Sequence, residues 1–92
     1  MGANKQTADD GRRRFLRAIH SYRQVNGRYP SQSEMATISS RTRDNVRARL
    51  HTLWKRGLIT TDIQMARSVR ITPQGYEFAN ITDGAQYDRE GV

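Results

Sequence analysis

Four arginines lie within nine residues, in the stretch SRTRDNVRARL at positions 40–50. Each guanidinium carries a planar fork of N–H donors, and this fork fits the oxygen atoms of a phosphate or the edge of a guanine base. Small or polar side chains lie between the arginines: Thr42, Asp44, Asn45 and Ala48. Such a segment can bind a polyanion along its length and also contact bases, so the chemistry that it predicts is nucleic-acid recognition.

The charge of the whole chain supports this prediction. The net charge is +7 for 92 residues, and residues 12–70 hold fourteen Arg or Lys against three acidic residues. Residues 71–92 carry a charge of −3. A basic region of this size favours a polyanionic partner, most often a nucleic acid. The alternative is a basic surface that serves solubility alone.

Several other activities lack the residues that they need. The chain has no cysteine, which excludes disulfides, thiolate metal sites and cysteine nucleophiles. His20 and His51 are far apart, and no metal-binding spacing, carboxylate pair or phosphate-binding glycine loop is present. We therefore expect no enzyme activity, catalytic residue, metal, cofactor or small-molecule ligand. No apolar run reaches the roughly 18 residues of a membrane span. We thus expect no membrane partner and a cytoplasmic, nucleoid-associated protein.

The spacing of apolar residues predicts the elements that position the arginines. We expect disorder over residues 1–8, then a helix that Asp9 or Asp10 caps and that ends at Asn26-Gly27. The apolar residues of this helix recur at helical spacing: Phe15, Leu16, Ile19, Tyr22 and Val25.

Two further helices follow. Ser31-Gln32-Ser33-Glu34 is a capping-box sequence and predicts a short helix that buries Met35 and Ile38. Thr42 is the predicted cap of a third helix, over residues 42–56, which ends at Gly57. One apolar stripe runs along this helix, opposite its polar residues, and we expect all of it to be buried: Val46, Leu50, Leu53 and Trp54.

The pattern changes after Gly57. Residues 58–61 and 68–72 predict the strands of a hairpin, with Val69 and Ile71 facing inward and Arg67 and Arg70 pointing outward. Thr72-Pro73 predicts the start of a short helix with Tyr76, Phe78 and Ala79, and residues 81–92 a flexible acidic tail. The predicted fold is mainly α with a small β-hairpin. It is a winged helix-turn-helix over residues 9–80, with a three-helix core, a two-stranded wing and a short C-terminal helix.

Three stretches resemble the N-terminal DNA-binding domain of LexA-type repressors: NGRYPSQSEMATIS, VRARLHTLWKRGLI and RSVRITPQG. The segment ITPQGYEF is also similar to the one that follows the wing in MarR-like regulators. The resemblance covers residues 12–79. The protease and dimerisation domain of LexA-type repressors has no counterpart in this sequence, so we carry over neither self-cleavage nor that route to dimers.

The resemblance implies base contacts in the first two turns of the third helix, at Thr42, Asp44, Asn45, Arg47 and Ala48. The side-chain amide of Asn45 suits adenine, the guanidinium of Arg47 suits guanine, and the methyl group of Ala48 suits a thymine methyl group. Asp44 either accepts from a cytosine amine or complements the helix dipole. Further residues are expected to contact the DNA backbone or to act from the wing: Ser31, Gln32, Ser33, Arg41, Arg43, Arg49, His51, Lys55, Gln64, Arg67 and Arg70. The run Arg12-Arg13-Arg14 either adds non-specific affinity or is simply solvated.

The predicted function is sequence-specific binding of double-stranded DNA by a small transcriptional regulator, a repressor that occupies promoter DNA. One alternative is an architectural, replication-associated or recombination-associated DNA-binding protein of the same fold. The other is a protein- or RNA-interaction module. Homodimerisation on palindromic sites stays open, with the first helix and the helix over residues 73–80 as candidate dimer surfaces.

Overall fold

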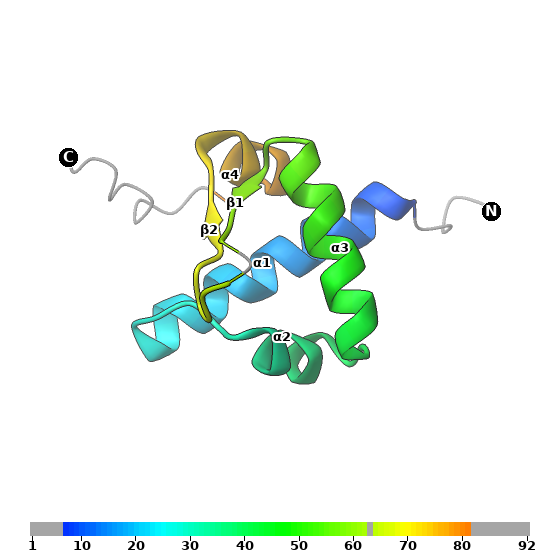
Figure 1. Ribbon diagram of the computed structural model, residues 1–92. Coiled ribbons are helices and arrows are strands. Elements are labelled where there is room, and N and C mark those ends of the chain that lie inside the picture. Colours follow the sequence, from blue (N-terminus) through cyan, green and yellow to red (C-terminus); the bar gives the residue numbers. More distant parts are fainter. Residues whose placement is uncertain (1–6, 63, 82–92) are drawn as a thin grey trace.

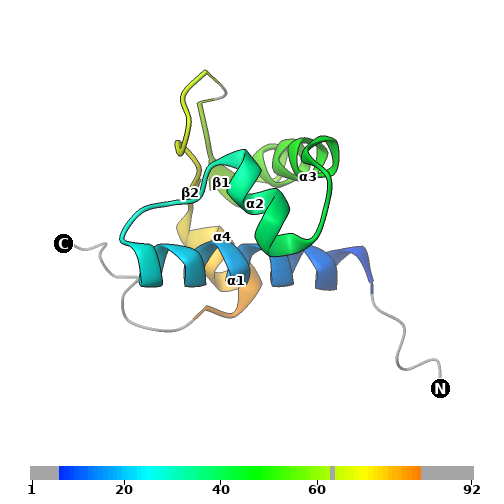
Figure 2. The same ribbon diagram turned by 90° about the horizontal axis from the view of Figure 1, so that it is seen from below.

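The computed structural model describes residues 7–62 and 64–81. They form four helices and two short strands, in the order α1 (Ala8–Asn26), α2 (Gln32–Ser39), α3 (Arg43–Lys55), β1 (Ile59–Thr60), β2 (Arg70–Ile71) and α4 (Pro73–Ala79) (Figure 1). In the view of Figure 2, α2, α3 and the hairpin lie on one side of the long helix α1. The architecture is mainly helical, with a small two-stranded antiparallel sheet.

α1 begins with a capping box at Thr7. The Thr7 hydroxyl accepts a hydrogen bond from the Asp10 backbone N–H at 3.0 Å, and the Asp10 carboxylate accepts one from the Thr7 N–H at 3.3 Å. The prediction of disorder over residues 1–8 with a cap at Asp9 or Asp10 is therefore wrong for Thr7 and Ala8. The reason is that the reciprocal bonds satisfy two backbone donors at once. Residues 1–6 lie outside the described part of the chain.

α1 ends at Gly27, as predicted, in a left-handed conformation with φ 76°. Its side chains Phe15, Leu16 and Ile19 are buried. Tyr22 is only half-buried, and Val25 is 83% exposed although it continues the apolar spacing. The last turns of α1, which carry Val25, extend past α2 and α3 (Figure 1).

α2 begins at the predicted capping box. The Ser31 hydroxyl accepts from the Glu34 N–H at 3.2 Å, and the Glu34 carboxylate accepts from the Ser31 N–H at 2.8 Å. Met35 is buried, as predicted, but Ile38 is 39% exposed, contrary to the prediction. α2 has only eight residues and ends at Ser39, so Ile38 lies in a last turn that the core does not cover.

α3 is capped by Thr42, as predicted, and ends at Lys55. Leu50 and Leu53 are buried with Val46, but Trp54 is 51% exposed, so the prediction that Trp54 belongs to the core is wrong. Around the helix, Leu50 and Leu53 lie within about 40° of Val46, whereas Trp54 lies about 80° away. The core therefore covers the centre of the apolar stripe and leaves its edge in solvent.

The two strands are shorter than predicted, with two residues each. They pair antiparallel, with Ile59 opposite Ile71 and Thr60 opposite Arg70. Val69 and Ile71 are buried, which confirms their inward direction. The connection between the strands projects away from α1, on the side that carries α3 (Figure 2).

Thr72 caps α4 and joins three parts of the chain. Its hydroxyl accepts from the Gly75 N–H at 3.0 Å and donates to the Gly57 carbonyl at 2.7 Å. Its own N–H donates to the Leu58 carbonyl at 3.1 Å. Gly75 lies so close to the end of α3 and the start of β1 that a Cβ there would overlap the Leu58 carbonyl oxygen. This close approach explains a glycine inside a helix, where it otherwise costs stability.

One cluster of buried side chains joins all of these elements: Phe15, Leu16, Ile19, Tyr29, Met35, Val46, Leu50, Leu53, Leu58, Ile59, Val69, Ile71 and Ala79. Tyr76, Phe78 and Ile81 are partly buried against it. Ile81 is therefore not part of a flexible tail, and residues 82–92 of that prediction lie outside the described part. None of the helices in residues 7–62 and 64–81 combines the length and apolar character that a membrane crossing requires.

Candidate nucleic-acid interface

The side of α3 that faces away from the core carries exposed polar residues and one alanine. We call it the α3 outer face; it consists of Asp44, Arg47, Ala48, His51 and Lys55, all exposed. These residues lie between about 100° and 200° from Val46 around the helix. The short Ala48, at one edge of this face, leaves room for a flat partner to approach the helix backbone.

Thr42 and Asn45 are bonded to each other at the start of α3. The Thr42 Oγ1 accepts from the Asn45 backbone N–H at 3.1 Å and from the Asn45 side-chain amide at 2.9 Å. Both lone pairs of this hydroxyl are therefore used within α3. Asn45 keeps its amide oxygen and a second N–H for a partner. Of these two predicted base contacts, Asn45 thus offers a base more hydrogen-bonding groups than Thr42.

The cations near the α3 outer face are not paired with any carboxylate of the described residues. Arg41, Arg43, Arg47 and Lys55 are exposed, and within the described residues none of them makes an ion pair. The carboxylates Asp9, Asp10 and Glu34 instead pair with arginines of other segments: Arg12, Arg13, Arg28, Arg56 and Arg67. The positive charge of this side of the molecule is therefore available to an anion.

Arg67 points inward, in contrast to the outward direction predicted for it. Its guanidinium donates to both carboxylate oxygens of Glu34, at 2.6 and 3.1 Å, and to the Tyr29 carbonyl at 3.2 Å. Strand alternation would place Arg67 on the same face as Val69 and Ile71, so it gave no ground for an outward direction. Arg67 lies before β2 in a turn with φ 60°, and its hydrogen bonds to Glu34 hold it in place. Hydrogen bonds from Arg67 and from the Ser31 backbone lower the pKa of Glu34 to about 2.

The rest of the hairpin is more open. Arg70 is exposed, as predicted, but its guanidinium lies along the hairpin. It donates to the carbonyls of Arg67 and Val69 at 2.8 and 2.9 Å and lies 4.7 Å from the centre of the Tyr29 ring. Gln64 is exposed, and its backbone N–H donates to the Asp62 carboxylate at 3.0 Å. Its side chain stays available to a partner.

The start of α2 is occupied by the protein's own groups. Ser31 exchanges two hydrogen bonds with Glu34, so its hydroxyl and its N–H are both engaged. The Glu34 carboxylate at this end already supplies the negative charge that a helix start favours. Gln32 is half-buried, and Ser33 is exposed. A phosphate at this end, as predicted from the sequence, would have to approach the carboxylate of Glu34.

Two side chains of α3 lie in positions that differ from those predicted from the sequence. Arg49 is turned toward α1, with its guanidinium carbon 5.7 Å from the centre of the Phe15 ring. Trp54 is exposed beside His51, with ring centres 5.9 Å apart and an angle of 36° between the planes. The edge position of Trp54 in the apolar stripe was the one feature of the sequence that could have indicated its exposure.

Within residues 7–62 and 64–81, no three residues among His, Cys, Asp and Glu are placed to hold a metal ion. His20 lies edge to face with Tyr76, with ring centres 5.6 Å apart.

Comparison of the sequence with models of protein families gives no match, and comparison with curated proteins gives no match either. The α3 outer face and its charges are thus the features from which a function can be inferred.

Proposed function

We propose that the protein binds double-stranded DNA in a sequence-specific manner, as a winged helix-turn-helix regulator. In this proposal α2 and α3 form the helix-turn-helix, and α3 enters the major groove with its outer face. The hairpin acts as the wing and lies over the flanking backbone or minor groove. One observation carries the proposal: α3 buries one side in the core and presents on the other, beside short polar side chains, exposed cations that no described carboxylate pairs with.

The residues divide into two roles. Arg47 can bind a guanine through two parallel hydrogen bonds, and Asn45 can bind an adenine with its remaining amide groups. Ala48 lets the helix backbone approach the base edges. Arg43, His51 and Lys55 would contact phosphates, which supply affinity and register but little sequence information. Repression then follows from occupation of promoter DNA.

Selection of binding sites from random duplex DNA tests the proposal. We expect one enriched motif, and a palindromic motif would indicate binding as a dimer. The affinity for the enriched duplex is then measured against salt concentration. For about five to eight neutralised phosphates, log K against log salt should have a slope of roughly −4.5 to −7. A slope near zero would remove DNA binding as the function.

An architectural DNA-binding protein is the second candidate, and one observation favours it. The Asn45 amide is partly engaged by Thr42, so one of the two side chains proposed for paired hydrogen bonds to a base has fewer groups to offer. Such a protein would bind the enriched duplex only slightly better than random duplexes, whereas a regulator prefers its site by about 10³-fold or more. A preference for single-stranded RNA over duplex DNA would instead indicate an RNA-interaction module.

A further inference from the structure

A second group of arginines lies along the edge of α3 that faces away from the hairpin. The first turns of α1 pass this edge, while the hairpin lies beyond the opposite one (Figures 1 and 2). The group consists of Arg12 from α1, Arg41 from the turn before α3 and Arg49 from α3, which are near enough for the charges of Arg41 and Arg12 to act on Arg49. We call these three residues the arginine seam. Burial lowers the pKa of Arg49, and the nearby positive charges of Arg41 and Arg12 lower it further.

The Arg49 guanidinium is held against α1 without a hydrogen-bond partner for one of its nitrogens. The Nη1 atom is buried and makes no hydrogen bond. Gly11 gives the guanidinium room, because a Cβ at Gly11 would lie 3.2 Å from Nη1, a tight contact. Both features are unfavourable by themselves: a glycine inside a helix costs stability, and so does a buried N–H without an acceptor.

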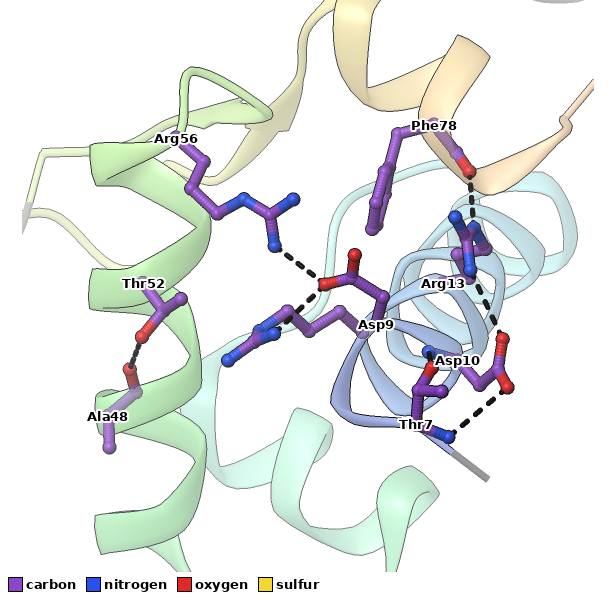
Figure 3. Close-up of polar contacts among 9 residues, drawn as sticks. Thr7, Asp9, Asp10, Arg13, Ala48, Thr52, Arg56 and Phe78 are labelled. Atoms are coloured by element: carbon purple, nitrogen blue, oxygen red, sulfur yellow. Dashed lines mark hydrogen bonds and ion pairs between the residues drawn. The ribbon is translucent and has the colours of Figure 1, made fainter. Parts of the chain in front are cut away.

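Asp9 pairs with Arg12 of the seam but not with Arg41 or Arg49. Asp9 accepts from Arg56 at 2.7 Å and from Arg12 at 3.0 Å, so its charge is shared between these two arginines (Figure 3). Arg13, the next arginine of α1, pairs with Asp10 and donates to the Phe78 carbonyl. Within the described residues, Arg41 and Arg49 make no ion pair with a carboxylate. Two cations with unused donors therefore remain close together at this edge.

We propose that the arginine seam binds a phosphate of the DNA backbone, on the strand that flanks α3 on the side opposite to the hairpin. A helix in the major groove has a sugar-phosphate backbone on each side, and the seam lies where the second backbone passes. The two free oxygens of a phosphodiester would accept from the guanidinium groups of Arg41 and Arg49 and would relieve their mutual repulsion. This inference rests on the proposed function, since it assigns a DNA contact to a different edge of the same helix.

The test compares the double variant Arg41→Gln/Arg49→Gln with Arg14→Gln, a matched control on the exposed side of α1. We expect the double variant to reduce the magnitude of the salt slope by about 1, the value for one lost phosphate contact, and Arg14→Gln to leave it unchanged. Ethylation interference identifies which phosphate of the DNA the arginine seam contacts. One ethylated phosphate should weaken binding of the wild-type protein, and the same modification should have no effect on the double variant.

The outcomes separate this inference from the proposed function. If the wild-type protein shows no salt-dependent binding to duplex DNA, the proposed function fails and the seam proposal fails with it. If the wild type binds but the double variant keeps its slope and its ethylation pattern, only the seam proposal is overturned. Arg49 packs on Phe15 and its loss could unfold the chain, so circular dichroism accompanies each variant. Should the double variant be unfolded, Arg41→Gln alone decides through the ethylation pattern, because Arg41 is exposed.

Discussion

Glu34 and Arg67 join the first turn of α2 to the hairpin through two hydrogen bonds of 2.6 and 3.1 Å, although they are 33 positions apart in the sequence. The same Glu34 carboxylate also accepts from the Ser31 N–H and closes the capping box of α2. One side chain thus both starts a helix and holds the hairpin beside it. Paired bonds from one guanidinium restrict orientation more than a single bond does, so this pair sets the direction of the hairpin.

Acidification should break this pair. Hydrogen bonds from Arg67 and the Ser31 backbone lower the pKa of Glu34 from 4.5 to about 2. The unfolded chain therefore binds a proton at higher pH than the folded chain does, and stability falls as the pH falls between these two values. We expect the free energy of unfolding of the wild type to decline over this window more steeply than that of Glu34→Gln. Urea unfolding of both proteins at a series of pH values measures this decline. Parallel curves of unfolding free energy against pH would show that the Glu34–Arg67 pair contributes nothing to stability.

Arg67 and Arg70 should affect DNA binding in different ways. Arg67→Gln removes a guanidinium that Glu34 already holds, so binding should weaken through displacement of the hairpin while the salt slope stays unchanged. Arg70 is exposed, and Arg70→Gln should reduce the magnitude of the slope by about 1 if this residue contacts a phosphate. Titrations of one duplex at several salt concentrations compare the two variants. A reduced slope for Arg67→Gln would show that Arg67 leaves Glu34 for the DNA.

The two sides of α3 should separate folding from recognition. Asn45→Ala and Arg47→Ala alter exposed side chains, so the melting temperature should change by only a few degrees. Each variant should lose about 1–3 kcal/mol of discrimination at one or two base pairs. Leu50→Ala creates a cavity in the core and should cost roughly 2–5 kcal/mol of stability. Binding-site selection with the two surface variants is the measurement, and an unchanged motif for both would mean that α3 does not read the sequence.

Gly75→Ala should destabilise the protein. The added Cβ would meet the Leu58 carbonyl oxygen, which is backbone, and the Ile71 side chain at 2.7 Å. Neither can move without shifting α4 or the hairpin, so we expect a loss of about 1–3 kcal/mol. Gln74→Ala changes an exposed residue of the same helix and is the matched control. Thermal unfolding of both variants checks the difference; an equal melting temperature for Gly75→Ala would contradict the close packing of α4.

Trp54 provides a direct reporter because it is the single tryptophan of the chain. Its side chain is 51% exposed, so acrylamide should quench its fluorescence efficiently in the unbound protein. In the proposed complex Trp54 lies on the helix that enters the groove, and duplex DNA should reduce the quenching. Trp54→Phe should fold with nearly unchanged stability, since the indole is not in the core. Inefficient quenching without DNA would show that Trp54 is buried after all.

The starts of α2 and α3 and the end of α1 were predictable because helix caps are local. Thr42 and the pair Ser31 and Glu34 begin their helices through bonds within three residues, and Gly27 ends α1 through its own backbone conformation. Hydrophobic spacing likewise located the buried side of α3. It failed for Trp54, because the width of an apolar stripe depends on which elements lie beside it, and a helical wheel does not contain that information.

The candidate site was less predictable than the fold for a similar reason. Its exposed arginines are easily counted in the sequence, but their chemistry depends on which carboxylates the fold brings near them. Arg56 pairs with Asp9 across 47 positions, while Arg47 has no such partner in the described part of the chain. Periodicity within one helix or strand cannot indicate a pairing between distant segments. The division of the arginines into paired and unpaired groups therefore had to come from the structure.

The hydrogen bonds of Thr72 have a consequence for how the protein opens. Through Gly57, Leu58 and Gly75 this one residue connects the end of α3, the first strand and the start of α4. Unwinding the last turn of α3 would therefore release the cap of α4, and loss of α4 would uncover part of α1. We expect these elements to open as one cooperative unit rather than to fray separately, so the last turn of α3 should stay formed in the unbound protein.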